Sequence, residues 1–194
     1  MKQQKKLNII NRYSRFEAIK GDPDEAKARN ITTGELGLWQ SWLNLLNEEK
    51  DKVENGEDYL HIIEDDCILS KTLITSIKNN ATAYDHFDIV ATDMYVNPSI
   101  YSGINEKVLR ARRNSEVRIL DNIYSGCTAS IIIKNSKIEK VLNILSEYYQ
   151  GREKIIPIDN FIRRCSKEKR LKIGTTIPFL STVRLDKINE STIQ

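Results

Sequence analysis

Short apolar runs alternate along this chain with stretches of helical periodicity, and this alternation restricts the fold more than any other feature. Runs of strand length lie at 59–63, 87–91 and 128–133. Apolar residues spaced by three and four positions indicate helices at 33–46, 138–145 and 157–165. Strands that alternate with helices in this way predict an α/β layered domain.

The first of the strand-length runs ends abruptly at three consecutive acids, Glu64, Asp65 and Asp66. In open α/β sheets ligands gather at the carboxyl ends of strands, so these carboxylates would lie where a substrate is expected. Neighbouring carboxylates repel one another unless a cation or hydrogen-bond donors compensate them, and Mg²⁺ and Mn²⁺ prefer such hard oxygen ligands. A solvated acidic turn without a ligand is the alternative, and the triplet alone fits both.

Composition excludes several classes of protein. The chain has 194 residues, the size of one domain spanning 1–194, and 40% of them are apolar, enough for a core. Its longest aliphatic run, Ile131–Ile133, is too short to cross a bilayer. The formal charge of +3 gives little reason to expect nucleic acid as a partner. Three cysteines and two histidines, widely spaced, fit neither a disulfide framework nor a zinc site and favour a cytoplasmic location.

Local signals give further expectations about individual segments. The polar segment 21–30 has the composition of a loop, and the irregular stretch 95–123 that of a functional loop region or of a disordered segment. Thr33 is expected to cap the helix that follows it, in which Trp39 and Trp42 would belong to the core. Cys67 is expected to be a small buried packing residue.

Six short motifs occur in order along residues 8–193. Three of them read R-F-x-A-x-x-G at 15–21, G-E-x-G-x-x-x-S at 34–41, and a strand with E-D-D at 61–66. The others are a glycine that opens an apolar strand at 126–132, P-I-D at 157–159 and S-T-I at 191–193. In order and approximate spacing, these motifs resemble glycosyltransferase family 25, the lipooligosaccharide and procollagen galactosyltransferase group.

The resemblance implies a GT-A-like, Rossmann-like fold, in which helices flank a mixed sheet. It also implies an enzyme that transfers a hexose, namely galactose from UDP-galactose, to a saccharide acceptor such as a lipooligosaccharide. Such a transfer would invert the anomeric configuration and require Mn²⁺ or Mg²⁺. The expected partners are therefore a nucleotide-sugar donor and a saccharide acceptor.

The donor side of the expected site would be built from four residues. By analogy with the last acid of D-x-D motifs, Asp66 is the first choice for a direct metal ligand. A cation held by carboxylates stabilises a diphosphate leaving group. Glu64 would assist at a metal-bound water or at the ribose, and Asp65 would contribute to substrate binding. By resemblance, Arg15 would contact the donor diphosphate.

The acceptor hydroxyl must lose its proton as it attacks, which requires a base within hydrogen-bond reach. Asp159 is the candidate base, because Pro157 and Ile158 would fix it at the start of a helix. An acid in the first helical turn is also favoured by the helix dipole alone, so both roles stay open. Glu35 is a second catalytic candidate, for which a structural role at a helix start is the alternative.

Two departures from the family pattern bear on whether the protein is an active transferase. Trp42 occupies the position where the family has His, and the first family strand, of the type I-x-V-I-N-L, has no counterpart, because Met1 would fall in the helix that follows it. The domain is therefore expected to be truncated at its N-terminus relative to the family. A non-catalytic remnant that binds carbohydrate or serves as a structural module is the alternative to an active transferase. A metal-dependent phosphohydrolase would need a second carboxylate cluster, which the sequence does not suggest.

Two basic groups remain, at 110–113 and 163–172. They fit solvated surfaces, or contacts to an acidic lipooligosaccharide or to a membrane surface at its periphery.

Overall fold

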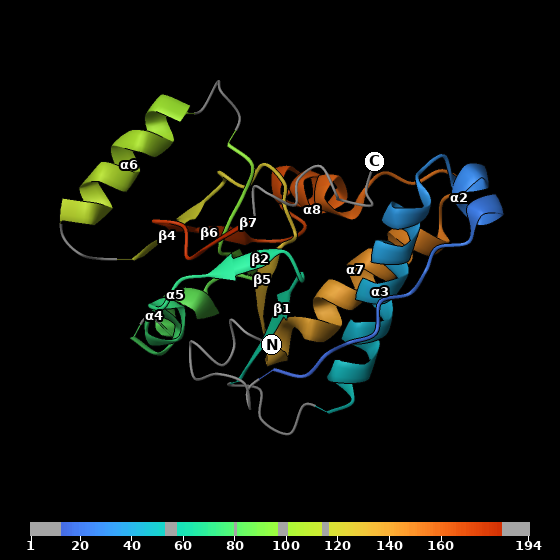
Figure 1. Ribbon diagram of the computed structural model, residues 1–194, viewed down its shortest axis with the longest axis horizontal. Coiled ribbons are helices and arrows are strands. Elements are labelled where there is room, and N and C mark those ends of the chain that lie inside the picture. The colour runs from blue at the N-terminus through green and yellow to red at the C-terminus, as the bar shows by residue number, and fades with distance from the viewer. Residues whose placement is uncertain (1–12, 53–57, 80, 97–100, 114–116, 184–194) are drawn as a thin grey trace.

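The centre of the molecule is a mixed sheet. The structure, a computed structural model, describes residues 13–52, 58–79, 81–96, 101–113 and 117–183, and within them five strands pair in the order β1-β5-β3-β6-β4 (Figure 1). These strands are β1 (Tyr59–Ile63), β5 (Ser130–Lys134), β3 (Ile89–Ala91), β6 (Ile173–Ile177) and β4 (Arg118–Asp121). β3 and β6 pair in parallel, and the other neighbours pair antiparallel. The carboxyl ends of β1, β3 and β6 therefore share one edge of the sheet with the start of β5.

Three helices pack against one face of the sheet. They are α3 (Thr33–Lys50), α7 (Ile138–Gln150) and α8 (Ile158–Lys167), of which α3 and α7 lie side by side (Figure 1). Ile131 and Ile133 of β5 join one core cluster with Trp39 of α3 and Phe161 of α8. The Trp39 indole is fully buried, and its Nε1 donates a hydrogen bond of 2.8 Å to the carbonyl of Ile156. This bond satisfies the one polar atom of a large core side chain.

The opposite face has its own, smaller core cluster. Two short helices, α4 (Leu73–Asn79) and α5 (Ala81–Asp85), contribute Leu73 and Tyr84, which meet Val90 and Ile132 of the sheet. A two-stranded sheet of β2 (Cys67–Leu69) and β7 (Ser181–Val183) packs here as well. Alternate residues of β5 thus point to opposite cores, as the two-residue period of a strand requires.

The elements that the sequence predicted with clear periodicity are confirmed. The fold is α/β, with helices on both faces of a mixed sheet, and α3, α7, α8, β1, β3 and β5 lie where apolar patterns placed them. Trp39, Trp42 and Cys67 are buried as expected. The predicted cap of α3 was wrong by one position, because Thr32 rather than Thr33 has the extended backbone that a cap needs.

The polar segment 21–30 was wrongly predicted to be a loop. It contains the helix α2 (Pro23–Arg29), whose N-cap is Asp22. The Asp22 carboxylate accepts hydrogen bonds from the backbone N–H groups of Asp24 and Glu25 at 3.0 and 2.9 Å. A proline at the first helical position and an acid before it are helix-start signals, which the polar composition masked.

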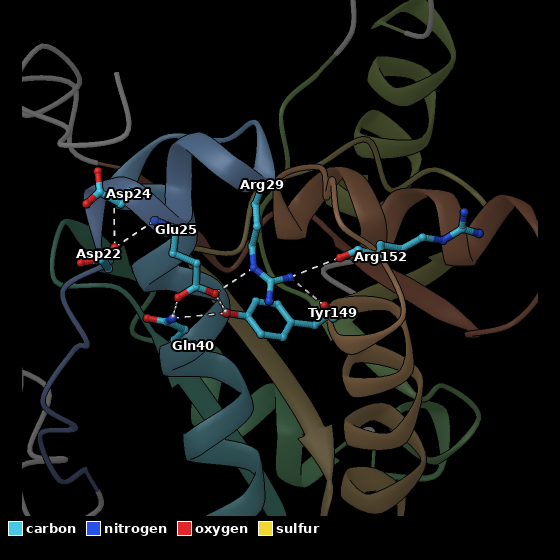
Figure 2. A network of polar contacts seen from close by, with 7 residues as sticks. All are labelled: Asp22, Asp24, Glu25, Arg29, Gln40, Tyr149 and Arg152. Atoms are coloured by element: carbon cyan, nitrogen blue, oxygen red, sulfur yellow. Dashed lines mark hydrogen bonds and ion pairs between the residues drawn. The ribbon is translucent and has the colours of Figure 1, made fainter.

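Figure 2 shows how α2 is attached to α3 and α7, two of the helices that cover one face of the sheet. The Arg29 guanidinium donates to Glu25 at 2.8 Å and to the carbonyl of Tyr149 at 2.9 Å, and lies 4.3 Å from the centre of the Tyr149 ring. Glu25 also accepts from Gln40 of α3 at 3.2 Å and from the Tyr149 hydroxyl at 3.1 Å. One planar cation and one carboxylate therefore join α2, α3 and α7.

The stretch 95–123 is not a structureless loop either. It contains α6 (Tyr101–Arg113), which projects from the body of the molecule, and the edge strand β4 (Figure 1). Within the described residues, no helix has both the length and the apolar character needed to span a membrane. The expectation about a missing first strand concerns the start of the chain, and residues 1–12 lie outside the described ranges.

Candidate functional site

Three carboxylates lie in a tight turn at the carboxyl end of β1. The backbone N–H of Glu64 donates to the carbonyl of Ala129 at 2.9 Å, which continues the ladder between β1 and β5 by one residue. The Cys67 N–H then donates to the Glu64 carbonyl at 3.2 Å, and β2 begins at Cys67. Glu64 and Asp66 are half-buried and Asp65 is exposed. The acidic triplet thus lies at the sheet edge that the sequence predicted.

The Glu64 carboxylate is held in place by its neighbour strand. Its Oε1 accepts a hydrogen bond of 2.7 Å from the Thr128 hydroxyl, just before β5. Burial raises the pKa of Glu64, the Thr128 bond opposes this, and the negative charges of Asp66, Asp159 and Asp65 raise it further. Glu64 is therefore the centre of a group of mutually repelling carboxylates.

Asp159 reaches this group from the start of α8. Its Oδ1 accepts from the N–H of Asn160 at 2.7 Å. Its Oδ2 lies beside Gly126, which has a φ of +124°, and a Cβ at that glycine would be only 3.2 Å from this oxygen. Gly126 thus supplies both a backbone conformation that L side chains rarely adopt and the space for the carboxylate. The structure therefore brings Asp159 close enough to Glu64 for its negative charge to raise the pKa of that carboxyl group.

The structure also describes the other two residues expected at the site, Glu35 and Arg15. Glu35 forms a capping box with Thr32: its carboxylate accepts from the Thr32 N–H at 2.7 Å, and its own N–H donates to the Thr32 hydroxyl at 3.2 Å. The capping box is the structural role that the sequence offered for Glu35 as the alternative to a catalytic one. Arg15 is exposed in the extended segment that precedes α2.

A row of hydrogen bonds crosses the sheet beneath the carboxylates. His61 contacts the Tyr13 hydroxyl at 2.7 Å through Nδ1 and the Ser130 hydroxyl at 2.8 Å through Nε2. Thr92 donates to the Ser130 hydroxyl at 2.6 Å and meets the Ser181 hydroxyl at 2.7 Å. Burial lowers the pKa of His61 to about 4, so the imidazole is neutral at pH 7. The row joins β1, β5, β3 and β7, which fixes the strand ends that carry the site.

Two side chains at this edge were not identified from the sequence as site residues. Tyr95, four residues beyond β3, is exposed and borders Gly126. Arg163, one turn after Asp159 in α8, donates from Nη1 to the Ser125 carbonyl at 3.4 Å. An aromatic residue shortly after a strand end was the available signal for Tyr95, whereas Arg163 was hidden in a basic stretch.

The carboxylate oxygens at this site fit a divalent cation that takes only part of its coordination from the protein. Glu64 and Asp66 offer hard carboxylate oxygens, and their mutual repulsion is relieved by a positive ion. In the described part of the chain, no group of three or more His, Cys, Asp or Glu side chains is arranged to hold a metal. Mg²⁺ and Mn²⁺ at nucleotide sites commonly use one or two carboxylates and complete their shell with phosphate oxygens and water.

Asp93, just past β3, is a buried carboxyl group whose charge is poorly compensated. Its Oδ1 accepts from the Met94 N–H at 2.8 Å. Burial raises the pKa of Asp93 from 3.8 to about 6, although hydrogen bonds from the Met94 and Val183 backbone oppose this. The folded protein therefore holds this proton to a higher pH than the unfolded chain does.

The pH dependence of stability should report this proton. Because the folded-state pKa of Asp93 is raised, the stability it contributes is complete below about pH 4 and is lost as the pH rises through about 6. We expect Asp93→Asn to match the wild type at about pH 3.5 and to be more stable by on the order of 2 kcal/mol at about pH 7.5. Urea unfolding across this range, in EDTA, measures the difference, and a difference that does not change with pH would contradict the assignment.

Comparisons with known proteins complete the description of the site. Of the six motifs, the one at 191–193 lies outside the described residues, and those at 61–66, 126–132 and 157–159 meet at the sheet edge. The family resemblance itself remains a prediction. A scan against protein-family models found no matching family, and a search of curated proteins found no match to the chain.

Proposed function

We propose that this protein is a metal-dependent, inverting glycosyltransferase with a GT-A-like fold. In the proposed reaction it transfers galactose from UDP-galactose to a saccharide acceptor such as a lipooligosaccharide. The observation that supports this most is the approach of Asp159, from the start of α8, to Glu64, from the end of β1. Carboxylates that come from separate elements but lie at one end of the strands can serve two functions. Some can hold a cation, and another can act as a base on the opposite side of a bound substrate.

On the donor side, Glu64 and Asp66 are the residues that would hold the cation together with the donor diphosphate. Bound there, a divalent cation would offset the negative charge that develops on the leaving diphosphate. The Thr128 hydroxyl, 2.7 Å from Glu64, fixes the orientation of one carboxylate before any ligand binds. Such preorganisation reduces the reorganisation required during the reaction.

On the acceptor side, Asp159 acts as the general base. The acceptor hydroxyl oxygen forms a bond to the anomeric carbon as the bond between that carbon and the diphosphate oxygen breaks, and Asp159 takes the hydroxyl proton. The Asn160 N–H holds Oδ1 at 2.7 Å, and Oδ2 faces Gly126, where no side chain intervenes. Attack from the side opposite the leaving group inverts the anomeric centre.

The proposal is tested by the fate of UDP-galactose in the presence of Mn²⁺. We expect slow release of UDP with water as acceptor, and β-galactose as the first sugar product in the proton NMR spectrum. Asp159→Asn should lower this rate by about 10²- to 10⁴-fold, the usual contribution of general acid–base catalysis. Glu139→Gln, which removes an acid from the first turn of α7, is the matched control and should leave the rate unchanged.

Three results would contradict the proposal in different ways. Absence of UDP release from UDP-galactose and UDP-glucose would favour the non-catalytic alternative. Release of α-galactose would exclude inversion, and full activity in Asp159→Asn would exclude Asp159 as the base.

A further inference from the structure

Tyr95 is an exposed aromatic side chain next to a group of carboxylates. The ring is 64% exposed, which places it among the few large apolar side chains of the described residues that face solvent. Two of the others, Tyr101 and Leu109, belong to the projecting helix α6. Tyr95 and Tyr101 are the tyrosines that the structure describes as exposed. Of the two, Tyr95 borders Gly126 at the candidate site. A single exposed apolar side chain is common on protein surfaces, so it is the position of Tyr95 beside the carboxylates, rather than its exposure alone, that suggests a ligand.

The backbone of Tyr95 is fixed on both sides. Its N–H donates to the carbonyl of Gly126 at 3.2 Å, and its carbonyl accepts from the Ser125 hydroxyl. The residues around it are partly or fully buried, Met94 before it and Val96 after it. The ring is therefore presented to solvent by an anchored segment, which limits the entropy lost when a ligand binds.

The ring borders the same glycine as the candidate base. A Cβ at Gly126 would lie 3.7 Å from Cδ2 of Tyr95 and 3.2 Å from Oδ2 of Asp159. The buried part of the Tyr95 side chain raises its pKa, and Cys127, Glu64 and Asp159 raise it further, which agrees with a hydroxyl that is near the carboxylates. An aromatic edge and a carboxylate oxygen thus both border one position that has no side chain.

This combination matches the chemistry of a pyranose ring. A pyranose presents apolar C–H groups on its faces, which pack on an aromatic ring, and hydroxyls around its rim, which donate hydrogen bonds to carboxylates. The sugar nearest Asp159 in the proposed reaction is the acceptor, because its hydroxyl gives up a proton to that carboxylate. The position of Tyr95 therefore favours the acceptor over the donor.

Resting on the proposed function, we infer that the exposed face of Tyr95 is the platform on which a pyranose ring of the acceptor stacks, with a hydroxyl of that ring directed at Asp159. The inference assigns an acceptor-binding residue on the segment that follows β3. It also places the acceptor over Gly126, in the segment that leads into β5.

Binding of simple pyranosides tests the inference. The probes are methyl β-galactopyranoside and methyl β-glucopyranoside, titrated by saturation-transfer NMR into the full chain with and without UDP and Mn²⁺. Tyr95→Ala should weaken binding by about five- to tenfold, the size expected for loss of one aromatic contact. Tyr95→Phe, which keeps the ring, should retain binding. Tyr101→Ala removes a tyrosine of similar exposure (61%) on α6 and should bind as the wild type does.

The affinity for UDP, measured in the same samples, separates this inference from the proposed function. Pyranoside binding that depends on Tyr95 in a protein without UDP affinity would support the platform and overturn the transferase. UDP binding without any pyranoside binding, or equal pyranoside binding in Tyr95→Ala and the wild type, would overturn the platform. Loss of UDP affinity in Tyr95→Ala would also overturn it, because the ring would then stack on the donor base.

Discussion

Asp66→Asn should remove the Mn²⁺-dependent stabilisation of the protein by UDP and UDP-galactose. In the wild type, a ligand at about 100 times its dissociation constant adds about 2.7 kcal/mol to the free energy of unfolding. For a domain of this size that raises the melting temperature by about 5–11 °C. Asparagine preserves the shape of the side chain but removes its charge, so the cation would lose one of its two proposed protein ligands. Thermal unfolding with each nucleotide, with and without Mn²⁺, measures the effect.

Two variants make this experiment specific. Asp58→Asn is the matched control, because it carries the same substitution immediately before β1, at the opposite end of that strand, and it should keep the full stabilisation. Asp65→Asn, at the exposed acid, should lose less of it than Asp66→Asn does. A Mn²⁺-dependent rise that survives in Asp66→Asn would exclude Asp66 as the metal ligand.

Gly37→Ala should destabilise the fold severely, because the segment Ile19–Gly21 lies directly on the first turns of α3. A Cβ at Gly37 would be 2.4 Å from the carbonyl oxygen of Ile19 and 3.0 Å from the nitrogen of Gly21. The Ile19 N–H also donates to the Ser41 hydroxyl at 2.8 Å, so the segment cannot move away without loss of this bond. We expect a cost of about 3 kcal/mol, at the upper end of overpacking penalties, which lowers the melting temperature by about 6–12 °C.

Gly103→Ala, at a second helical glycine, should have the opposite effect on stability. No described atom outside the helix lies within 4 Å of a Cβ built there. Alanine is a better helix former than glycine by about 1 kcal/mol, so α6 should be stabilised slightly. Similar melting temperatures for the two alanine variants would show that the close approach of Ile19 to α3 is not a constraint.

Elements with a strong local pattern could be predicted from the sequence. The helices α7 and α8 have apolar residues at a spacing of three and four, and Val141, Leu145 and Phe161 are buried accordingly. The motifs at 15–21 and 34–41 could also be found in the sequence, but their role in packing could not be inferred from it. Gly21, Gly37 and Ser41 serve the packing of one segment on α3, which only the three-dimensional contact reveals.

Elements whose stability depends on distant partners could not be predicted. The strand β6 contains Gly174, Thr175 and Thr176, and all five of its residues are buried. Gly174 is there because a Cβ would be 2.3 Å from the Ile119 side chain, and the Thr176 hydroxyl donates to the Thr92 carbonyl at 3.3 Å. Polar residues that are satisfied across strands give no apolar signal in the sequence.

The candidate site was predictable in part for the same reason. Glu64, Asp65 and Asp66 follow an apolar run, so their position at a strand end could be inferred locally. The meeting of these acids with Asp159 depends on the left-handed conformation of Gly126 and on how α8 packs, about a hundred residues further along the chain. Tyr95 gains its significance only through those neighbours.

Diffraction from crystals grown with Mn²⁺ and UDP, measured at the manganese absorption edge, tests the central claim most directly. The account predicts one strong anomalous peak in contact with the carboxylates of Glu64 and Asp66, with the UDP diphosphate on its other side and Asp159 facing the site. UDP bound elsewhere, or bound at this edge without a manganese peak between these two carboxylates, would contradict it.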